Sequence, residues 1–111
     1  MKKYFLLLLL SLMSHQVFAS DLKCQIAHDN EVVFKNKIAL KINQKTLVGK
    51  TALVAAYVTE KENQNFILEN FLVEYEARFY SQGVLNQKSD QLVSSIWGRE
   101  HLIDISCGLV E

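Results

Sequence analysis

Proline is absent from this chain of 111 residues, and glycine, with four residues, and cysteine, with two, are scarce. No low-complexity stretch or internal repeat is present, so nothing in the sequence could serve as a linker between domains. Neither charge sign dominates, because twelve basic residues balance twelve acidic ones without forming blocks. This balance argues against a dedicated nucleic-acid-binding protein and against a polybasic membrane-surface protein.

The N-terminal segment has the three parts of a secretory signal peptide. Lys2 and Lys3 form a positively charged start, and the run from Phe5 to Met13 is apolar but too short to span a bilayer. Val17-Phe18-Ala19 then offers the small-x-small pattern that signal peptidase recognises. We therefore expect cleavage after Ala19, which leaves an exported chain.

The expected products are a signal peptide of residues 1–19 and a single small domain of residues 20–111, located in the periplasm or outside the cell. No second apolar segment of spanning length follows, so no stable membrane anchor is expected after cleavage. A lipoprotein signal would need Leu at the third position before Cys24 and small residues at the next two. Asp21, Leu22 and Lys23 occupy these positions, so lipidation is not expected.

The two cysteines, Cys24 and Cys107, are predicted to form a disulfide. Their number is even, the expected compartment is oxidising, and a domain of this size gains little stability from its core alone. The bridge would fasten the two ends of the domain together, since Cys107 lies near the C-terminus. Two free, buried thiols are the alternative.

Alternating apolar and polar residues predict that the domain consists mainly of strands. Leu22, Cys24 and Ile26 alternate with polar neighbours, which is typical of a strand with one buried face. The predicted strands are residues 21–28, 32–34, 37–43, 47–50 leading into 51–59, 66–68, 71–79, 91–97 and 101–110, with loops at 60–65, 83–90 and 98–100.

Residues 66–80 are ambiguous, because their apolar residues also recur at helical spacing. A helix would leave Ile67, Val73 and Tyr80 on its polar side, whereas a strand has no such exceptions from Val73 to Phe79. The strand is therefore favoured. The predicted fold is all-β, a small antiparallel barrel or sandwich of six to eight strands with termini joined by a disulfide.

No catalytic or cofactor motif is present, so neither an enzyme nor a cofactor is expected. His101, Asp104 and Ser106 could form a nucleophilic triad, but strand alternation places His101 on the opposite side from the other two. His28 and His101 are weak candidates for metal ligands. If Cys24 lies opposite Cys107 on antiparallel strands, His28 is diagonal to His101, within reach of a shared metal.

Trp97 and Arg99 are the candidate binding residues. The alternation of residues 91–97 points Trp97 outward at the mouth of the 98–100 hairpin loop, and Trp beside Arg is a composition that binding hot spots favour. The alternative is that Trp97 packs as a lid over the end of the domain.

Three classes of function follow from these observations. The first is a non-enzymatic binding or inhibitor-like module of the cell envelope, whose expected partner is another envelope or secreted protein. The second is a structural or envelope-maintenance protein without a defined ligand, and a metal-binding or enzymatic role is a distant third. The sequence does not indicate an oligomeric state.

Overall fold

A computed structural model describes residues 18–110, so residues 1–17 of the predicted signal peptide and Glu111 lie outside the described residues. The described chain contains eight strands, a single 3-10 turn and no α-helix. The elements are β1 (Phe18–His28), β2 (Glu31–Lys41), β3 (Thr46–Lys50), β4 (Val54–Lys61), η1 (Glu62–Gln64), β5 (Asn65–Leu72), β6 (Ala77–Val84), β7 (Gln91–Trp97) and β8 (Leu102–Leu109).

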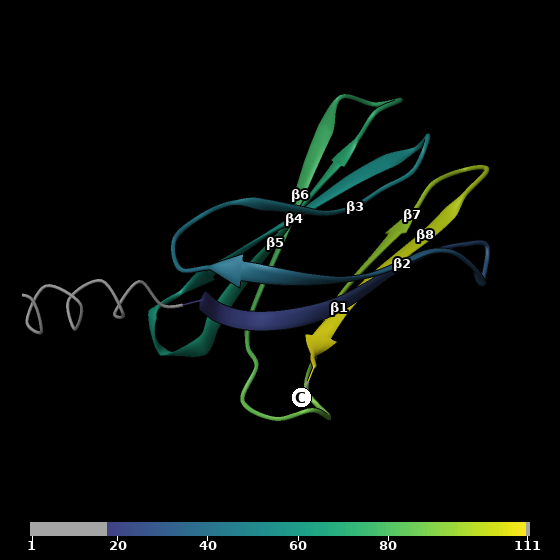
Figure 1. Cartoon of the computed structure of the whole chain (residues 1–111). Helices are drawn as coiled ribbons and strands as arrows, with labels where there is room; N and C mark the ends of the chain where they lie inside the picture. The colour runs from purple at the N-terminus through teal and green to yellow at the C-terminus, as the bar shows by residue number, and fades with distance from the viewer. Residues whose placement is uncertain (1–17, 111) are drawn as a thin grey trace, which may run out of the picture.

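The strands form two antiparallel sheets of four strands each (Figure 1). Sheet A has the order β2-β1-β8-β7, and sheet B has the order β3-β4-β5-β6. Strands that follow one another in the chain are neighbours within each sheet, and β8 returns to pair with β1. The predicted all-β antiparallel class is confirmed.

The two sheets do not join into a barrel. A closed barrel would need hydrogen-bonded pairing between β2 and β3 and between β6 and β7, and each of these pairs is instead divided between the sheets. Of the two predicted architectures, the open, two-layered one is therefore the one that forms.

The core lies between the sheets and follows the alternation seen in the sequence. Leu22 and Ile26 of β1 are fully buried, as are Val58 of β4 and both Phe66 and Leu68 of β5. Along each strand, inward and outward residues alternate. This period of two places the apolar side chains on the face that points into the core.

The predicted disulfide is present and joins β1 to β8. Cys24 and Cys107 lie directly opposite each other in the antiparallel ladder, and both cysteines are buried within the hydrophobic core. The bridge therefore ties the first strand to the last strand inside sheet A.

Four turns gather at one end of the sandwich, at the upper right of Figure 1. We call this the turn end. In the β1–β2 turn, Asp29 and Asn30 both have positive φ, the conformation of a two-residue type I′ hairpin, which Asp and Asn tolerate better than other side chains. The other three turns are residues 51–53, 73–76 and 98–101.

Residues 66–80 adopt strand rather than helix, as favoured, but the uninterrupted strand expected for residues 71–79 is wrong. The chain turns at residues 73–76, so that Leu72 pairs with Ala77 across a β5–β6 hairpin. Val73 and Tyr75 keep the alternating pattern although they lie in the turn, where both are exposed. Periodicity alone could not reveal this turn.

Four further boundaries differ from those expected. Residues 32–34 and 37–41 belong to one strand, β2, whose edge position leaves most of its residues exposed and obscures the pattern. The segment 51–59 contains a turn before β4, and the 60–65 loop shrinks to η1 because the β4–β5 pairing continues to Lys61 and Asn65. The loop at 83–90 begins only after Val84, because β6 pairs with β5 up to that residue.

Candidate functional site

Trp97 projects into solvent at the turn end. Along β7, Leu92 is buried in the core, whereas Val93, Ser95 and Trp97 point to the outer face of sheet A. The exposed fraction of Trp97 is 80%, so the tryptophan does not pack as a lid over the core. Its outward position agrees with the alternation, while its role in binding stays a prediction.

Tyr75 lies beside the Trp97 hairpin. It belongs to the β5–β6 turn and is 61% exposed, and a side chain at Gly98 would come within 3.9 Å of the Tyr75 hydroxyl. Tyr75 and Gly98 border a small pocket with a volume of about 20 Å³. Ile96 and His101 also line this pocket. A hollow of this size holds no organic ligand, so the turn end offers an exposed surface rather than a cavity.

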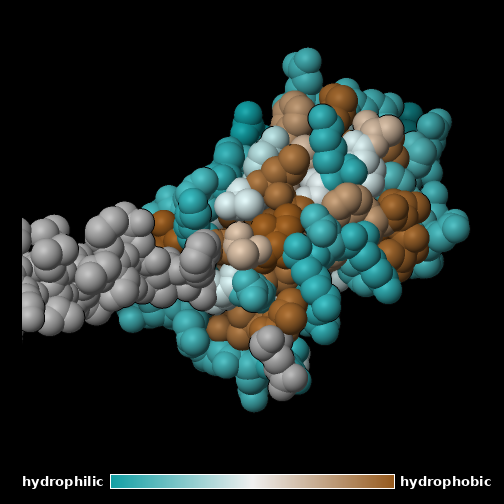
Figure 2. Space-filling model, in the orientation of Figure 1, coloured by the Kyte–Doolittle hydropathy of each residue, from teal (hydrophilic) through white to brown (hydrophobic). Residues whose placement is uncertain are grey.

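Exposed apolar side chains occur at this end and elsewhere on the surface. Among the described residues, eleven large hydrophobic side chains are exposed, and three of them belong to the turn end or its first flanking residues: Val73, Tyr75 and Trp97. Val32 and Val33 lie two and three residues after the 29–30 turn, on β2. Figure 2 shows apolar residues gathered across the middle of one face of the molecule, with hydrophilic residues at its margins. Arg99 is exposed beside Trp97 and forms no ion pair within the part of the chain that the structure describes.

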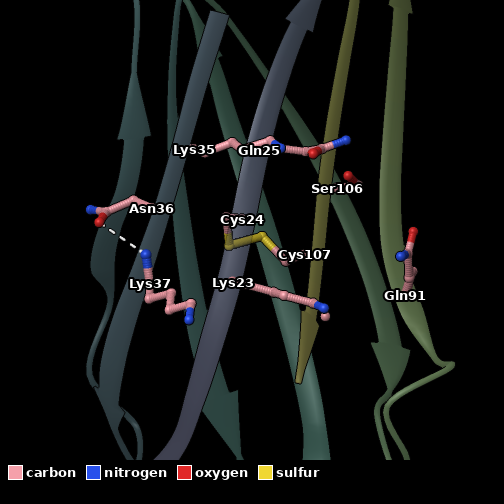
Figure 3. A pocket seen from close by; sticks show the side chains of 10 residues that line it. Lys23, Cys24, Gln25, Lys35, Asn36, Lys37, Gln91, Ser106 and Cys107 are labelled. Carbon is pink, nitrogen blue, oxygen red and sulfur yellow. Dashed lines mark hydrogen bonds between the residues drawn. A yellow bond between two sulfur atoms is a disulfide. The ribbon is translucent and has the colours of Figure 1, made fainter. Parts of the chain in front are cut away.

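A groove lies farther along sheet A, over β8 (Figure 3). It is open and has a volume of about 650 Å³. Ser106 and Gly108 of β8 have small side chains, and they lie opposite Gln25 and Lys23 of β1 in the ladder. Longer side chains on the neighbouring strands, including Gln91 of β7, therefore rise on either side of a low floor.

Three lysines line the groove: Lys23 of β1, and Lys35 and Lys37 of β2. Lys23 is directly opposite Lys37, a like-charge pair that costs stability in an antiparallel ladder. The three ammonium groups form no ion pair in the described range, 18–110. Asp21 and Asp104 occupy the same strands but do not line the groove, and Asp104 accepts a hydrogen bond from Ser95. The groove lining therefore holds three lysines and no carboxylate among the described residues.

The groove and Trp97 share the outer face of sheet A. Gln91 borders the groove at one end of β7, and Trp97 ends the same strand six residues later. A strand of this length spans about 20 Å. We call this surface the basic–aromatic face, defined by Lys23, Lys35, Lys37, Gln91 and Trp97. Sequence reasoning missed its lysines, although their spacing at 35 and 37 already places two of them on one side of a strand.

The residues considered for catalysis lie apart. Asp104 bonds to Ser95, Ser106 lines the groove, and His101 borders the small pocket at the turn end. Asp104 and Ser106 lie on β8, whereas His101 lies in the 98–101 turn before it, so the strand alternation assumed for His101 does not apply.

The β1–β8 register assumed for the metal hypothesis is confirmed, since His28 lies opposite Ile103. The ring nitrogen Nε2 of His28 is 3.3 Å from the Thr51 hydroxyl, a hydrogen bond that links β1 to the 51–53 turn. Among residues 18–110, no group of three or more His, Cys, Asp or Glu side chains is arranged to hold a metal ion.

Two carboxylates have shifted pKa values. Glu69 of β5 accepts hydrogen bonds from Lys45 and Arg78, at 2.8 and 3.1 Å, and the Lys45 bond in particular holds the pKa of Glu69 below its ordinary value. Burial raises the pKa of Glu60, although the Ser20 hydroxyl and backbone N–H oppose this effect. Both lie outside the basic–aromatic face.

Comparison with known protein families, curated proteins and solved structures finds no significant match to this chain. In the part of the chain that the structure describes, no helix is long and apolar enough to cross a membrane.

Proposed function

We propose that this protein is an exported, non-enzymatic binding module that holds an acidic segment of another envelope or secreted protein on its basic–aromatic face. The observation that carries the proposal is the presence, on one face of sheet A, of an 80% exposed tryptophan and a groove lined by three lysines without carboxylate partners.

Trp97 supplies the apolar part of this interaction. Tryptophan, tyrosine and arginine are the residues most enriched in binding hot spots, and Trp97, Tyr75 and Arg99 are exposed together on two adjacent turns. A large aromatic side chain left in water gains free energy when a partner covers it.

The groove supplies the charge. Lys23, Lys35 and Lys37 repel one another in the free protein, and an acidic partner would relieve this repulsion while its carboxylates are attracted to the ammonium groups. Neutral side chains such as Gln25 and Gln91 add hydrogen-bonding groups along the same groove. The volume of about 650 Å³ is typical of sites that hold a short segment or a small molecule.

Export is supported by two features. The Cys24–Cys107 disulfide is of the kind that persists in oxidising compartments, and the N-terminal segment has the pattern of a cleaved signal peptide. A disulfide-fastened sandwich presents its turns on a rigid scaffold, which suits a binding module.

Affinity capture from envelope extract tests the proposal. The native protein is expected to retain a partner that is released at high salt, because exposed ion pairs are screened. Trp97→Ala is expected to abolish capture with little change in stability, since the side chain is mostly exposed. The Lys23→Glu/Lys37→Glu double variant is expected to abolish capture through charge reversal.

Tyr80→Ala is the matched control, because Tyr80 is 62% exposed but belongs to β6 of sheet B. It should retain the partner. Equal capture by all variants would refute the basic–aromatic face as the binding surface. Capture of no partner by the native protein would instead favour a structural role in the envelope.

A further inference from the structure

The buried carboxylate of Glu60 lies at the end of the sandwich opposite the turn end, where it meets the start of the predicted mature chain. Glu60 is 4% exposed and follows the inward residues Val54, Ala56 and Val58 along β4. Its Oε2 atom accepts a hydrogen bond of 3.1 Å from the Ser20 hydroxyl, whereas its Oε1 atom is buried and has no hydrogen-bond partner among the residues that the structure describes.

The backbone of β1 brings Ser20 to this position. The register of β1 with β2 shifts between Phe18 and Asp21, so that the extra residue of a bulge lies beside Ser20. Bulges redirect side chains and are common at the ends of pairing. Ser20 precedes the inward residue Leu22 by two positions, and it therefore faces Glu60 across the two sheets.

Glu60 has no cationic partner in the described part of the chain. The lysines nearest in sequence and register, Lys41 and Lys61, are both exposed, and neither pairs with Glu60 within residues 18–110. A buried carboxylate with a single hydroxyl donor is costly compared with an apolar residue at the same place. The backbone nitrogen of Ser20 also lies close enough to favour the ionised form of Glu60.

We propose that cleavage of the Ala19–Ser20 bond completes the fold, because it creates an α-ammonium group on Ser20 that pairs with the buried carboxylate of Glu60. This inference rests on the export proposed above. Water adds across the peptide bond: Ala19 leaves with a carboxylate, and the Ser20 nitrogen takes up protons to become an ammonium group at neutral pH. The nitrogen of the residue whose hydroxyl already bonds Glu60 thereby gains both a charge and additional donors that could reach the Oε1 atom.

The processing site and the fold would then be matched to each other. A chain cut one residue earlier or later would carry its ammonium group about 3.5 Å away along the strand, out of reach of the same pairing. The uncut precursor would keep an unpaired carboxylate in its core and would be less stable than the mature protein.

Urea unfolding of three chains tests the ion pair. The first begins at Ser20 with a free amine, the second is the same chain acetylated at that amine, and the third begins at Ala19. All described core residues and both cysteines follow Ser20, so each chain keeps the described core and the disulfide and lacks at most the first two residues of β1. The free-amine Ser20 chain is expected to have a folding equilibrium constant about tenfold larger than either of the others, as a charge-assisted hydrogen bond provides.

Glu60→Gln supplies the matched control in all three chains. If the ion pair forms, acetylation should hardly change the folding equilibrium constant of the Glu60→Gln chain. An equal change in chains with and without the Glu60 carboxylate would overturn the ion pair. If Glu60→Gln does not fold, the three chains that keep Glu60 still test the pairing. Equal stability of the Ser20 and Ala19 chains would refute it.

Intact mass of the protein recovered from its producing cell tests the export on which the inference rests. A mass that begins at Ser20, with one disulfide, supports it. A diacylated mass that begins at Cys24 would overturn both the proposed export route and this inference, because the mature protein would then lack Ser20. A mass that begins at another residue before Cys24 would refute the inference while still supporting export.

Discussion

Three polar side chains are buried among the described residues, and they differ in their partners. Glu69 has two cationic partners, Glu60 has one hydroxyl partner, and the amide of Asn70 has none. The sequence does not distinguish these cases. Glu69 and Asn70 are adjacent in the sequence, and only the pairing of β5 with β4 and β6 shows that Asn70 points inward.

Asn70→Leu is expected to stabilise the protein. Asn70 is fully buried in the core, and both polar atoms of its side chain lack hydrogen-bond partners. Leucine has a similar size and loses no hydrogen bond there, so the free energy of unfolding should rise by about 1 to 3 kcal/mol. Urea denaturation measures this change, with the exposed Asn86→Leu as the control. A loss of stability in Asn70→Leu would contradict this reading of the core.

Glu69 is expected to stabilise the protein at neutral pH and not in acid. Its pKa is lowered in the folded state, so its contribution is fully present above the ordinary glutamate value of 4.5 and is lost as the pH falls through the folded pKa. Glu69→Gln should therefore unfold more easily than the native protein at pH 7, and the difference should shrink as the pH falls below 4.5. Thermal melts across this range measure it, with the exposed Glu62→Gln as the control, and a constant difference would contradict the ion pairs.

At the scale of the elements, local pattern was most informative where strands are regular. β7 has the predicted bounds because Leu92 and Ile96 alternate with outward residues up to the Gly98 turn. The 73–76 turn escaped prediction because exposed apolar residues preserve the alternation through it. The Asp29-Asn30 turn could have been predicted, because Asp and Asn tolerate positive φ better than other side chains. The strand predictions rested on alternation and did not consider this preference.

The β1–β8 connection is where sequence and structure agree most closely. Cys24→Ser or Cys107→Ser is expected to lower the free energy of unfolding by about 2 to 5 kcal/mol, because the bridge joins residues 83 positions apart and restricts the unfolded chain. The double variant should lose little more than either single variant, since both remove the same bond. Denaturant unfolding of all three variants measures this, and single losses that simply add would indicate independent contributions from two thiols.

At the scale of the whole molecule, the two parts of the proposed binding face, Trp97 and the lysine groove, could be predicted from the sequence to different extents. The exposure of Trp97 could be predicted from a single strand. The lysine groove could not, because it requires the lateral order β2-β1-β8-β7, which brings Lys35 and Lys37 beside Lys23 over the small residues of β8. The contact between Ser20 and Glu60 likewise joins two sheets, and no local pattern contains it.

Site-specific photo-crosslinking in the producing cell tests the central claim most directly. A photoreactive phenylalanine analogue replaces Trp97 or Gln91 on the basic–aromatic face, or Tyr80 on sheet B as the control. Binding through the basic–aromatic face predicts one shared protein adduct from positions 97 and 91 and none from position 80. An adduct of equal yield from position 80, or the absence of any adduct from positions 97 and 91, would contradict it.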